Sequence, residues 1–485
     1  MRSPFLFSVA TLLVSGVASA STFHVATTGS DTAAGSQAAP FKTIQRAANA
    51  AAAGDTVVVH PGTYTGFMVT KRGTPSAPIS FQADGAVQID GAATTDRDAI
   101  HIEGAAYVTI EGFTVTRAGR AGISALDCEH ITIRKNKVDQ NTKWGIFSAF
   151  CDDLVVEGNE ASRSAEQHGV YASNSADRPI IRNNKLWGNA QCGVHMNGDI
   201  SFGGDGVISG AIVENNVITD NGRAGGSGIN GDGVVDSTIR NNVLDGNHAS
   251  GISLYQIDGG KPSTGNKVIN NTVRMASDAR WAINIQDGSS GNTLRNNILI
   301  NPTPGRGVLD ICSACVAGLV SDHNAVSGPF MRAGNVMDLA AWKSATGLDA
   351  TSFTATDATL FAQGALTLSA ASPAIDKGSA DGAPATDVVG TARPQGAAVD
   401  VGAYEHCEGA CESTGGGDGN GSGDGSGSGD GSGSGDGSGS GDGTGSGDSD
   451  TESDTADDGG CNVGAPGAGL GLGLALGFLL RRRRR

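Results

Sequence analysis

The sequence predicts an all-β solenoid, in which one coil of about 23–25 residues recurs along residues 98–330. Each coil opens with a small residue followed by an apolar one, and an asparagine follows later in the same coil. Between this opening residue and the asparagine lie short strands in which apolar and polar residues alternate. Stacked coils bury a continuous core and place equivalent residues about 4.8 Å apart. The opening residues are Gly122, Gly145, Gly169, Gly193, Gly228, Gly251, Ala282 and Gly307.

Residues 1–20 have the pattern of a secretory signal peptide. Arg2 precedes an apolar stretch from Phe5 to Val17, and Ala18, Ser19 and Ala20 form a small-residue cleavage site. Cleavage before Ser21 predicts a secreted protein that folds where disulfides persist.

The charge of the body limits the class of partner. Residues 21–407 contain 27 basic and 37 acidic side chains, a formal charge of −10. An acidic body without a basic run argues against a nucleic-acid partner. An acidic polysaccharide stays open, because a local patch or a bridging cation overrides net charge. We expect a monomer.

The asparagines and cysteines test the register of the coils. We expect the asparagines to form a structural ladder of side-chain amides at one turn; they are Asn136, Asn159, Asn184, Asn216, Asn242, Asn271 and Asn297. Cys128 and Cys151 each lie six residues after an opening glycine, so they should stack on adjacent coils within disulfide reach. The other predictions are local pairs at Cys312/Cys315 and Cys407/Cys411, and a buried thiol at Cys192.

Two coils carry insertions. The opening residue and the ladder asparagine are 14 or 15 residues apart in five coils, but 23 apart in the Gly193 coil and 20 in the Gly251 coil. The extra residues lie near 199–210 and 256–266. Because these loops flank one short coil, we expect them to form two walls of a groove over Asn230 and Asp232.

Alternation along each strand predicts which side chains face out. Residues one and three positions after the opening residue should face the core, and those two and four positions after it should face solvent. Polar outward residues gather beside the two loops, and any solvated strand would also show such residues. Those expected to contact a ligand are Asn197, Asn230, Gln286 and, nearby, Arg280.

The repeats resemble the right-handed parallel β-helix of the pectate-lyase-like superfamily. The runs 26–31, 40–45, 54–59 and 61–64 are similar to the opening of many such proteins, including polysaccharide lyases of the family-nine type. The resemblance implies an all-β right-handed parallel β-helix, with an N-terminal cap and first coils over residues 21–97. It also implies a helix near Phe41 to Ala53 over the open end of the core.

The C-terminal part divides into three regions. Segments 372–376 and 400–405 resemble the closing segment of surface-anchored β-helix proteins, which implies a final coil and cap over 331–411. Residues 412–460 are a Gly/Ser/Asp linker, a composition typical of a disordered tether. Residues 461–485 contain Cys461, a short hydrophobic stretch and five arginines, and resemble the MYXO-CTERM sorting tag. The tag implies display on the cell surface, with membrane contact through the tag alone.

The outward residues suggest a lyase for an acidic polysaccharide. β-Elimination needs a cation that neutralises the sugar carboxylate and a base that removes the C5 proton. The carboxylates expected to hold Ca²⁺ are Asp199, Asp205, Asp232 and Asp258. The candidate bases are Lys261, His195 and Arg280, with Tyr255 as proton donor. Family-nine lyases use a tight aspartate cluster with a lysine, and no such cluster occurs in consecutive sequence here.

Two other functions fit the same residues. A glycoside hydrolase needs a carboxylate pair, for which Asp199 and Asp232 are the candidates. A tethered β-helix that binds glycan or a neighbouring cell without turnover needs neither a base nor a cation. Replacing Lys261 or His195 discriminates a lyase from a binder, because only the lyase would lose its activity.

Overall fold

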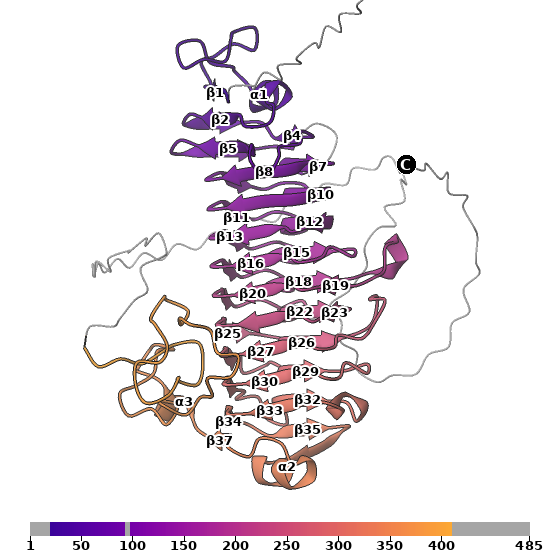
Figure 1. Cartoon of the computed structure of the whole chain (residues 1–485), viewed down its shortest axis with the longest axis vertical. Coiled ribbons are helices and arrows are strands. Elements are labelled where there is room, and N and C mark those ends of the chain that lie inside the picture. Colours follow the sequence, from indigo (N-terminus) through magenta and orange to yellow (C-terminus); the bar gives the residue numbers. More distant parts are fainter. Residues whose placement is uncertain (1–19, 93–97, 410–485) are drawn as a thin grey trace, which may run out of the picture.

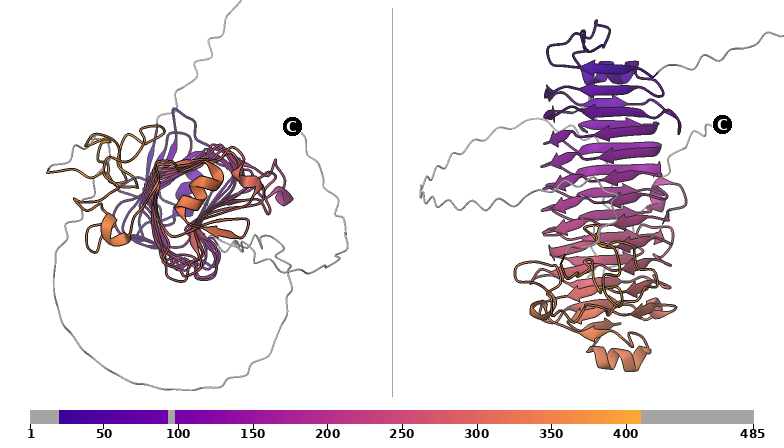
Figure 2. Two further views of the ribbon diagram at one scale, coloured as in Figure 1. Left: turned by 90° about the horizontal axis from the view of Figure 1, so that it is seen from below. Right: turned by 60° about the vertical axis from the view of Figure 1, so that its left-hand side comes forward.

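The computed structural model describes residues 20–92 and 98–409, which form one elongated stack of parallel coils (Figure 1). Each complete coil contributes three strands, so that three rows of strands run along the stack. Seen end-on, the coils superimpose (Figure 2). The predicted signal peptide, linker and sorting tag lie outside the described residues, except for Ala20.

Two of the three rows belong to one 23-stranded sheet, because the long strand β10 continues from the first row into the second. The first row comprises β4 (Phe67–Val69), β7 (Ile100–Glu103), β10 (Ala121–Arg134), β12 (Trp144–Asp152), β15 (Val170–Ser173), β18 (Val194–Asn197), β22 (Ser227–Asp232), β26 (Ser250–Tyr255), β29 (Trp281–Ile285), β32 (Gly307–Ile311), β35 (Phe330–Arg332) and the antiparallel β36 (Asn335–Met337). The second row comprises β1 (Thr22–Val25), β2 (Thr56–Val59), β5 (Ile79–Ala83), β8 (Ala106–Glu111), β13 (Val155–Glu157), β16 (Ile180–Arg182), β20 (Ile212–Glu214), β24 (Thr238–Arg240), β27 (Lys267–Ile269), β30 (Thr293–Arg295) and β33 (Val320–Asp322).

The third row is a separate 12-stranded sheet. Its strands are β3 (Gly62–Tyr64), β6 (Val87–Asp90), β9 (Thr114–Thr116), β11 (Lys137–Asp139), β14 (Glu160–Ser162), β17 (Lys185–Trp187), β21 (Val217–Thr219), β25 (Val243–Asn247), β28 (Thr272–Met275), β31 (Ile298–Ile300), β34 (Ala325–Ser327) and β37 (Phe353–Thr354). All strands of this row pair in parallel, as stacked coils require.

The core confirms the predicted alternation. The inward positions hold Ile123, Ala125, Ile146, Val194 and Met196, all with 0 % exposure in one continuous core. Parallel strands of neighbouring coils place Ile123 opposite Ile146 and Cys128 opposite Cys151. The core therefore follows from the spacing of the opening residues.

The asparagine ladder is present and extends to Asn324. Each ladder amide oxygen accepts hydrogen bonds from the coil before it, as when the Asn184 backbone N–H and Nδ2 both donate to Asn216 Oδ1 at 3.0 Å. The residue before each ladder asparagine has positive φ, for example 57° at Asn215. Asparagine and glycine tolerate that left-handed conformation, which explains the repeated Asn-Asn pairs.

A second ladder lies five residues after the first and was not predicted. It contains Asn141, Asn189, Asn221 and Asn247, whose side chains link successive coils at the other end of the third row. The Asn221 backbone N–H donates to Asn247 Oδ1 at 3.1 Å, and Asn221 Nδ2 donates to the same oxygen at 3.0 Å. Two ladders thus fix both turns that bracket this row.

Both predicted disulfides within the described residues are confirmed. Cys128 and Cys151 are bridged across adjacent coils with a Cα–Cα distance of 4.4 Å, and Cys312 is bridged to Cys315 at 5.1 Å. Cys407 is disulfide-bonded as well, whereas its predicted partner Cys411 lies outside the described residues. Cys192 is a buried thiol, as predicted.

Helices close the two ends of the stack (Figure 1). Helix α1 (Ile44–Ala50) lies at the N-terminal end and buries Ile44. It is shorter than the predicted helix, because Phe41 instead forms a parallel bridge with Val25. Helix α2 (Leu339–Thr346) covers the C-terminal end, where Trp342 stacks on Phe330 with ring centroids 5.0 Å apart.

The segment that follows α2 runs back along the side of the stack. After helix α3 (Asp357–Leu360), the Gly402 backbone N–H donates to Asn296 O at 2.7 Å, and Asn270 Nδ2 donates to Asp400 O at 3.0 Å. An Arg393–Glu405 ion pair of 2.7 Å, with both side chains 0 % exposed, holds this segment together. The closing motif therefore supports the flank of the stack, and α2 is the cap. No helix of the described residues is long and apolar enough to cross a membrane.

Candidate functional site

The outer face of the first row carries a continuous line of side chains from successive coils. Phe147 and Tyr171 lie two positions after their opening glycines, and with Trp144 they form an apolar cluster separate from the main core. They face outward as predicted. They are nevertheless buried, at 7 % exposure for Phe147 and 2 % for Tyr171, because neighbouring side chains on this face cover one another.

Aromatic stacking holds this outer line together. Trp144 stacks on Phe147 with ring centroids 4.3 Å apart, and Tyr171 stacks on His195 at 4.8 Å. Arg120 lies 6.0 Å from the Trp144 ring centroid. This part of the face is packed, whereas the sequence led us to expect solvated side chains.

At the N-terminal end of this line, Asp98 is 0 % exposed and bonds to Arg120 Nε at 2.8 Å and to the Ala121 backbone N–H at 3.0 Å. Burial alone would raise the pKa of Asp98, but the hydrogen bonds from Arg120 and His101 outweigh it and hold that pKa well below its ordinary value. The ionised carboxylate is thus stabilised in the folded protein.

We expect Asp98→Asn to lower the free energy of unfolding at pH 7 by about 2–3 kcal/mol, because it leaves Arg120 without its buried partner. The folded pKa lies below the unfolded one, so this contribution is present above about pH 4 and is lost as pH falls through the folded pKa. Denaturant unfolding of the wild type and of Asp98→Asn at pH 7 and pH 3 measures this contribution to the free energy of unfolding. The exposed Asp127→Asn is the control, and equal stability of the two variants at pH 7 would contradict this account.

His195, a predicted base, lies inside the packed line. Its side chain is 1 % exposed and its Nδ1 is 3.0 Å from His168 Nε2. Burial lowers the pKa of His195 to about 3, which makes the imidazole a weak base. The prediction of His195 as a catalytic base is therefore not supported, because the surrounding side chains shield it from a substrate.

Tyr255 and Asn230 are buried as a pair. Asn230 Nδ2 donates to the Tyr255 hydroxyl at 2.5 Å, and the two residues are 0 % and 2 % exposed respectively. A proton donor must reach the leaving oxygen of the substrate. The predicted roles of Tyr255 as donor and Asn230 as a ligand contact are not supported by this arrangement.

The two insertion loops meet above the short coil between them, so the predicted groove is filled. The Gly260 backbone N–H donates to Gly206 O at 2.6 Å, and the Ile200 N–H donates to Asp258 O at 3.0 Å. Strand β19 (Ile208–Ser209) also pairs with β23 (Val234–Val235). The loops, including the 3-10 helix η1 (Ile200–Phe202), therefore form a single ridge beside the first row.

Asp232 fastens this ridge to the coils. Its Oδ1 accepts the backbone N–H groups of Ile257 and Gly259 at 2.9 and 3.0 Å, and its Oδ2 accepts that of Asp258 at 2.8 Å. With 1 % exposure, the carboxylate is committed to the backbone of the second loop. Asp232 is therefore a poor candidate both for a Ca²⁺ ligand and for one member of a hydrolytic pair with Asp199.

The other predicted Ca²⁺ ligands do not converge. Asp199 Oδ1 accepts from Ser201, and Asp205 is exposed with its Oδ1 accepting the Val207 N–H at 3.0 Å. Asp258 lies near Asp199. The pKa of Asp258 is raised, mainly by burial and also by the negative charge of Asp199, while a hydrogen bond from Asn197 acts in the opposite direction. Among the described residues, the one group of three or more metal-binding side chains that converge is His168, Cys192 and His195. The four aspartates do not fit a Ca²⁺ ion together.

A cationic cluster lies on the first row beyond the ridge. Arg306 is exposed, with its guanidinium 5.6 Å from the Trp281 ring centroid, and Arg280 is half-buried. Burial first, and then the charge of Arg306, lowers the pKa of Arg280. The sequence predicted Arg280 as a ligand contact but did not identify Arg306.

Amide and carboxyl groups adjoin the two arginines. Gln286 Nε2 donates to Asn284 Oδ1 at 3.0 Å, and Asp310 is the strand partner of Asn284. Burial raises the pKa of Asp310, against the opposing effects of Gln286 and Arg306. The arrangement offers two guanidinium groups, an amide pair and a carboxyl group on one face.

Lys261 belongs to the second loop and is exposed. The next residue, Pro262, lies beside Gly288, where its Cγ would be 3.8 Å from an added Cβ. The backbone at this end of the second loop therefore lies next to the coil of Gln286. Of the three predicted bases, Lys261 and Arg280 belong to the C-terminal half of the stack and are accessible to solvent, since Lys261 is exposed and Arg280 is half-buried.

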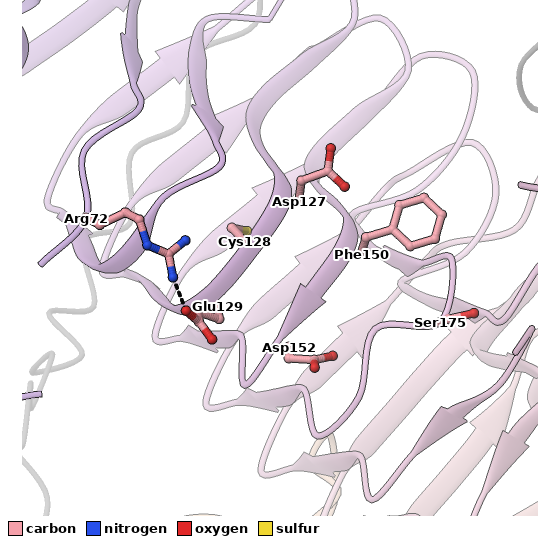
Figure 3. A pocket seen from close by; sticks show the side chains of 7 residues that line it. All are labelled: Arg72, Asp127, Cys128, Glu129, Phe150, Asp152 and Ser175. Atoms are coloured by element: carbon pink, nitrogen blue, oxygen red, sulfur yellow. Dashed lines mark hydrogen bonds and ion pairs between the residues drawn. The ribbon is translucent and has the colours of Figure 1, made fainter. Parts of the chain in front are cut away.

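A pocket of about 400 Å³ lies among coils N-terminal to the ridge (Figure 3). It is lined by Arg72, Asp127, Cys128, Glu129, Phe150, Asp152 and Ser175. Arg72 forms an ion pair with Glu129 and Arg178 forms one with Asp152 at 3.6 Å, which leaves Asp127 to set the charge of the pocket. This negative lining is a poor match for an acidic polymer.

Comparisons with known proteins agree with the fold. The family described as "Right handed beta helix region" matches residues 98–273 and 164–329, and "Protein of unknown function (DUF1565)" matches residues 27–70. Pectate lyase PEL9 of Emericella nidulans is 30 % identical over 207 residues, which are 36 % of this chain and half of that protein's length. The crystal structure of pectate lyase Pel9A aligns with a TM-score of 0.56 and 20 % identity, covering 80 % of this chain and 97 % of that one.

Proposed function

Because the chain is a right-handed parallel β-helix protein with a pectate-lyase-like fold, we propose that it acts on polysaccharide and cleaves an acidic one by β-elimination. The observation that carries the proposal is the pair Arg280 and Arg306 on the outer face of the first row. Lys261 stands on the adjoining loop. Secretion and cell-surface display through the C-terminal tag form part of the proposal.

The arginine pair suits a uronic-acid polymer. A guanidinium binds a carboxylate through two parallel hydrogen bonds, so Arg306 is suited to hold the sugar carboxylate in a fixed orientation. Trp281, whose ring lies against Arg306, limits the positions that this side chain adopts. The partly exposed Gln286 offers its amide group to sugar hydroxyls on the same face, and the buried Asn284 accepts from its Nε2 and positions it. Net acidity of the body does not oppose this binding, because the local charge is positive.

The proposed reaction needs one proton removed and one delivered. A base takes the proton from C5, a double bond forms between C4 and C5, and the C4–O bond breaks while the leaving oxygen takes a proton from solvent. Arg306 stabilises the negative charge that develops on the carboxylate. Arg280 and Lys261 are the two candidate bases, and the lowered pKa of Arg280 increases its deprotonated fraction at a given pH.

Absorbance of the unsaturated product tests the proposal. We expect the purified full chain, with its disulfides oxidised, to produce a rise in ultraviolet absorbance on one of pectate, alginate or a glycosaminoglycan, and none on a neutral polymer. Parallel samples with Ca²⁺ and with chelator test the expected cation dependence separately. A flat trace on the whole panel would contradict the lyase proposal.

Non-catalytic glycan binding is the second candidate function. It is favoured by the burial of His195 and Tyr255, which removes two of the groups that a lyase of this chain was expected to use. Retention of the chain on an immobilised acidic glycan, together with a flat absorbance trace, would support binding without turnover.

A further inference from the structure

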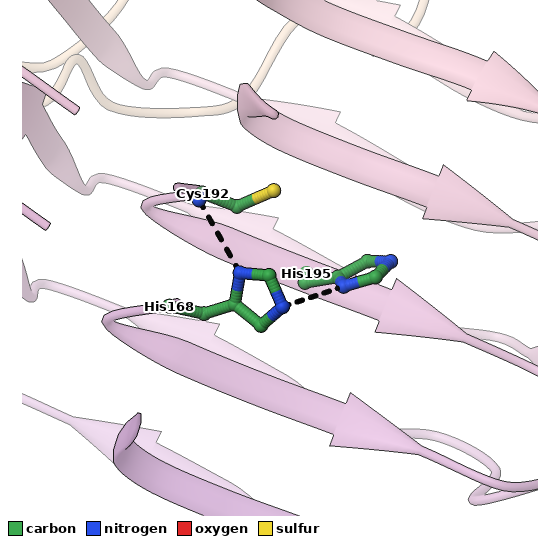
Figure 4. A group of neighbouring side chains, drawn as sticks. All are labelled: His168, Cys192 and His195. Atoms are coloured by element: carbon green, nitrogen blue, oxygen red, sulfur yellow. Dashed lines mark hydrogen bonds between the residues drawn. The ribbon is translucent and has the colours of Figure 1, made fainter. Parts of the chain in front are cut away.

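Three side chains with metal-binding atoms meet on the outer face between β15 and β18 (Figure 4). His168 and Cys192 directly precede the opening glycines of adjacent coils, and His195 lies on β18. Their ligand atoms all lie within 4.8 Å of one another, and the three residues are 0–1 % exposed. The proposed polysaccharide function does not use this cluster.

The donor set favours a soft metal ion. A thiolate and two imidazoles bind copper and zinc well, whereas calcium and magnesium prefer oxygen. Structural zinc sites are almost always four-coordinate. The group that converges among residues 20–92 and 98–409 has three members. Three donors in a closed site therefore match a three-coordinate ion better than zinc.

The charge of the ion also distinguishes monovalent copper from divalent zinc at this site. The cluster is shielded from water beside Tyr171, and Lys143 is near enough for its positive charge to act on His168. One thiolate neutralises a monovalent ion completely, but leaves a divalent ion with a net positive charge in this buried place. Burying a net charge beside a lysine is costly.

We propose that His168, Cys192 and His195 bind one monovalent copper ion. The Cys192 thiol loses its proton to solvent and the sulfur binds the ion, with no change of oxidation state. Without the ion, His168 Nδ1 accepts the Cys192 backbone N–H at 3.3 Å, and His168 Nε2 lies 3.0 Å from His195 Nδ1. Binding at Nε2 moves the His168 proton to Nδ1, and both hydrogen bonds are given up, because Nδ1 no longer accepts the Cys192 N–H while His168 Nε2 and His195 Nδ1 bind the ion instead of each other.

The distances are close to those of a bound state. Metal–nitrogen bonds of about 2.1 Å and metal–sulfur bonds of about 2.3 Å in a trigonal arrangement separate the donor atoms by about 3.5–3.8 Å. The two imidazole nitrogens are 3.0 Å apart, and the farthest pair of donors in the cluster is within 4.8 Å. Rotations of the three side chains that shift their donor atoms by about 1 Å therefore assemble the site without moving the strands.

Anaerobic titration with Cu(I) against a chromogenic Cu(I) chelator tests the proposal on the full chain. Ascorbate keeps the copper reduced and leaves the disulfides intact. We expect one equivalent of Cu(I) per chain, an increase in melting temperature, and loss of at least 90 % of the bound copper in Cys192→Ser and His168→Gln. His248→Gln, which changes a histidine outside the cluster, should bind like the wild type.

Two results would overturn the assignment. Stoichiometric Zn(II) binding in preference to Cu(I), with a thiolate charge-transfer band on Co(II) substitution, would show that the site selects a divalent ion. The absence of stoichiometric binding of either ion by the wild-type chain would show that the cluster serves packing alone. Both measurements use the wild-type chain, so neither depends on the folding of a variant.

Discussion

Arg280→Ala is expected to lower kcat/KM on the cleaved polymer at least ~100-fold, because a general base contributes that much or more to proton abstraction. The rate of the wild type should rise with pH, since only the deprotonated guanidine accepts a proton and its pKa is lowered by burial and by Arg306. Arg280→Lys should shift the rise to lower pH, as lysine has the lower ordinary pKa. Initial rates of ultraviolet absorbance from pH 6 to pH 10 give both results.

Arg223→Ala is the matched control, because Arg223 is an exposed arginine that forms an ion pair with the exposed Asp220. It should leave kcat/KM unchanged. Wild-type activity in Arg280→Ala, combined with a large loss in Lys261→Ala, would transfer the role of base to the loop lysine. Wild-type activity in both variants would contradict the proposed site.

Local spacing was sufficient to predict the coils. Residues that face the core of a stacked coil must be apolar, so Ile123, Ile146 and Val194 mark the same position on three coils. The Cys128–Cys151 bridge followed from the same register. The second ladder was missed, although Asn221 and Asn247 each lie five residues after a predicted ladder asparagine, a spacing that would have identified it.

The candidate site was predicted less well, because it depends on contacts between segments. The lengths of the two loops followed from the spacing, but their mutual packing did not. Gly206, Gly233, Gly259 and Gly260 allow the two backbones to touch; an added Cβ at Gly233 would lie 2.8 Å from Gly259 Cα. Glycines at facing positions of the two loops and the coil between them were the signal for a closed ridge.

Asp310 was missed because the register shifts by one residue in the last coils. Trp281, and not Ala282, is the strand partner of Gly307, so Asp310 stands opposite Asn284 on the outer face. Counting from Gly307 as an opening glycine placed Asp310 on the inner face. A one-residue shift exchanges the two faces of a strand, and this shift hid the carboxyl group that adjoins the cationic cluster.

The largest effect on stability is expected for Asn216→Ala, about 4 kcal/mol in the free energy of unfolding. Asn216 is 0 % exposed, and its Oδ1 accepts from both the backbone N–H and Nδ2 of Asn184. Its own Nδ2 donates to Ile181 O at 2.8 Å and to Asn242 Oδ1 at 2.9 Å. Alanine removes these four hydrogen bonds, and each buried group that is left without a partner costs about 1–3 kcal/mol. Asn184 Nδ2 and Asn242 Oδ1 keep one bond each, to Val156 O and from the backbone N–H of residue 216.

Denaturant unfolding and melting temperature measure this loss, and Asn335→Ala is the control because Asn335 is an exposed asparagine of β36. The control should stay within ~0.5 kcal/mol of the wild type. In a stack, each coil contacts only the coils directly before and after it. Loss of one ladder asparagine therefore weakens the interfaces of its coil with both neighbouring coils. Equal stability of the two variants would mean that the ladder contributes no more than a surface amide does.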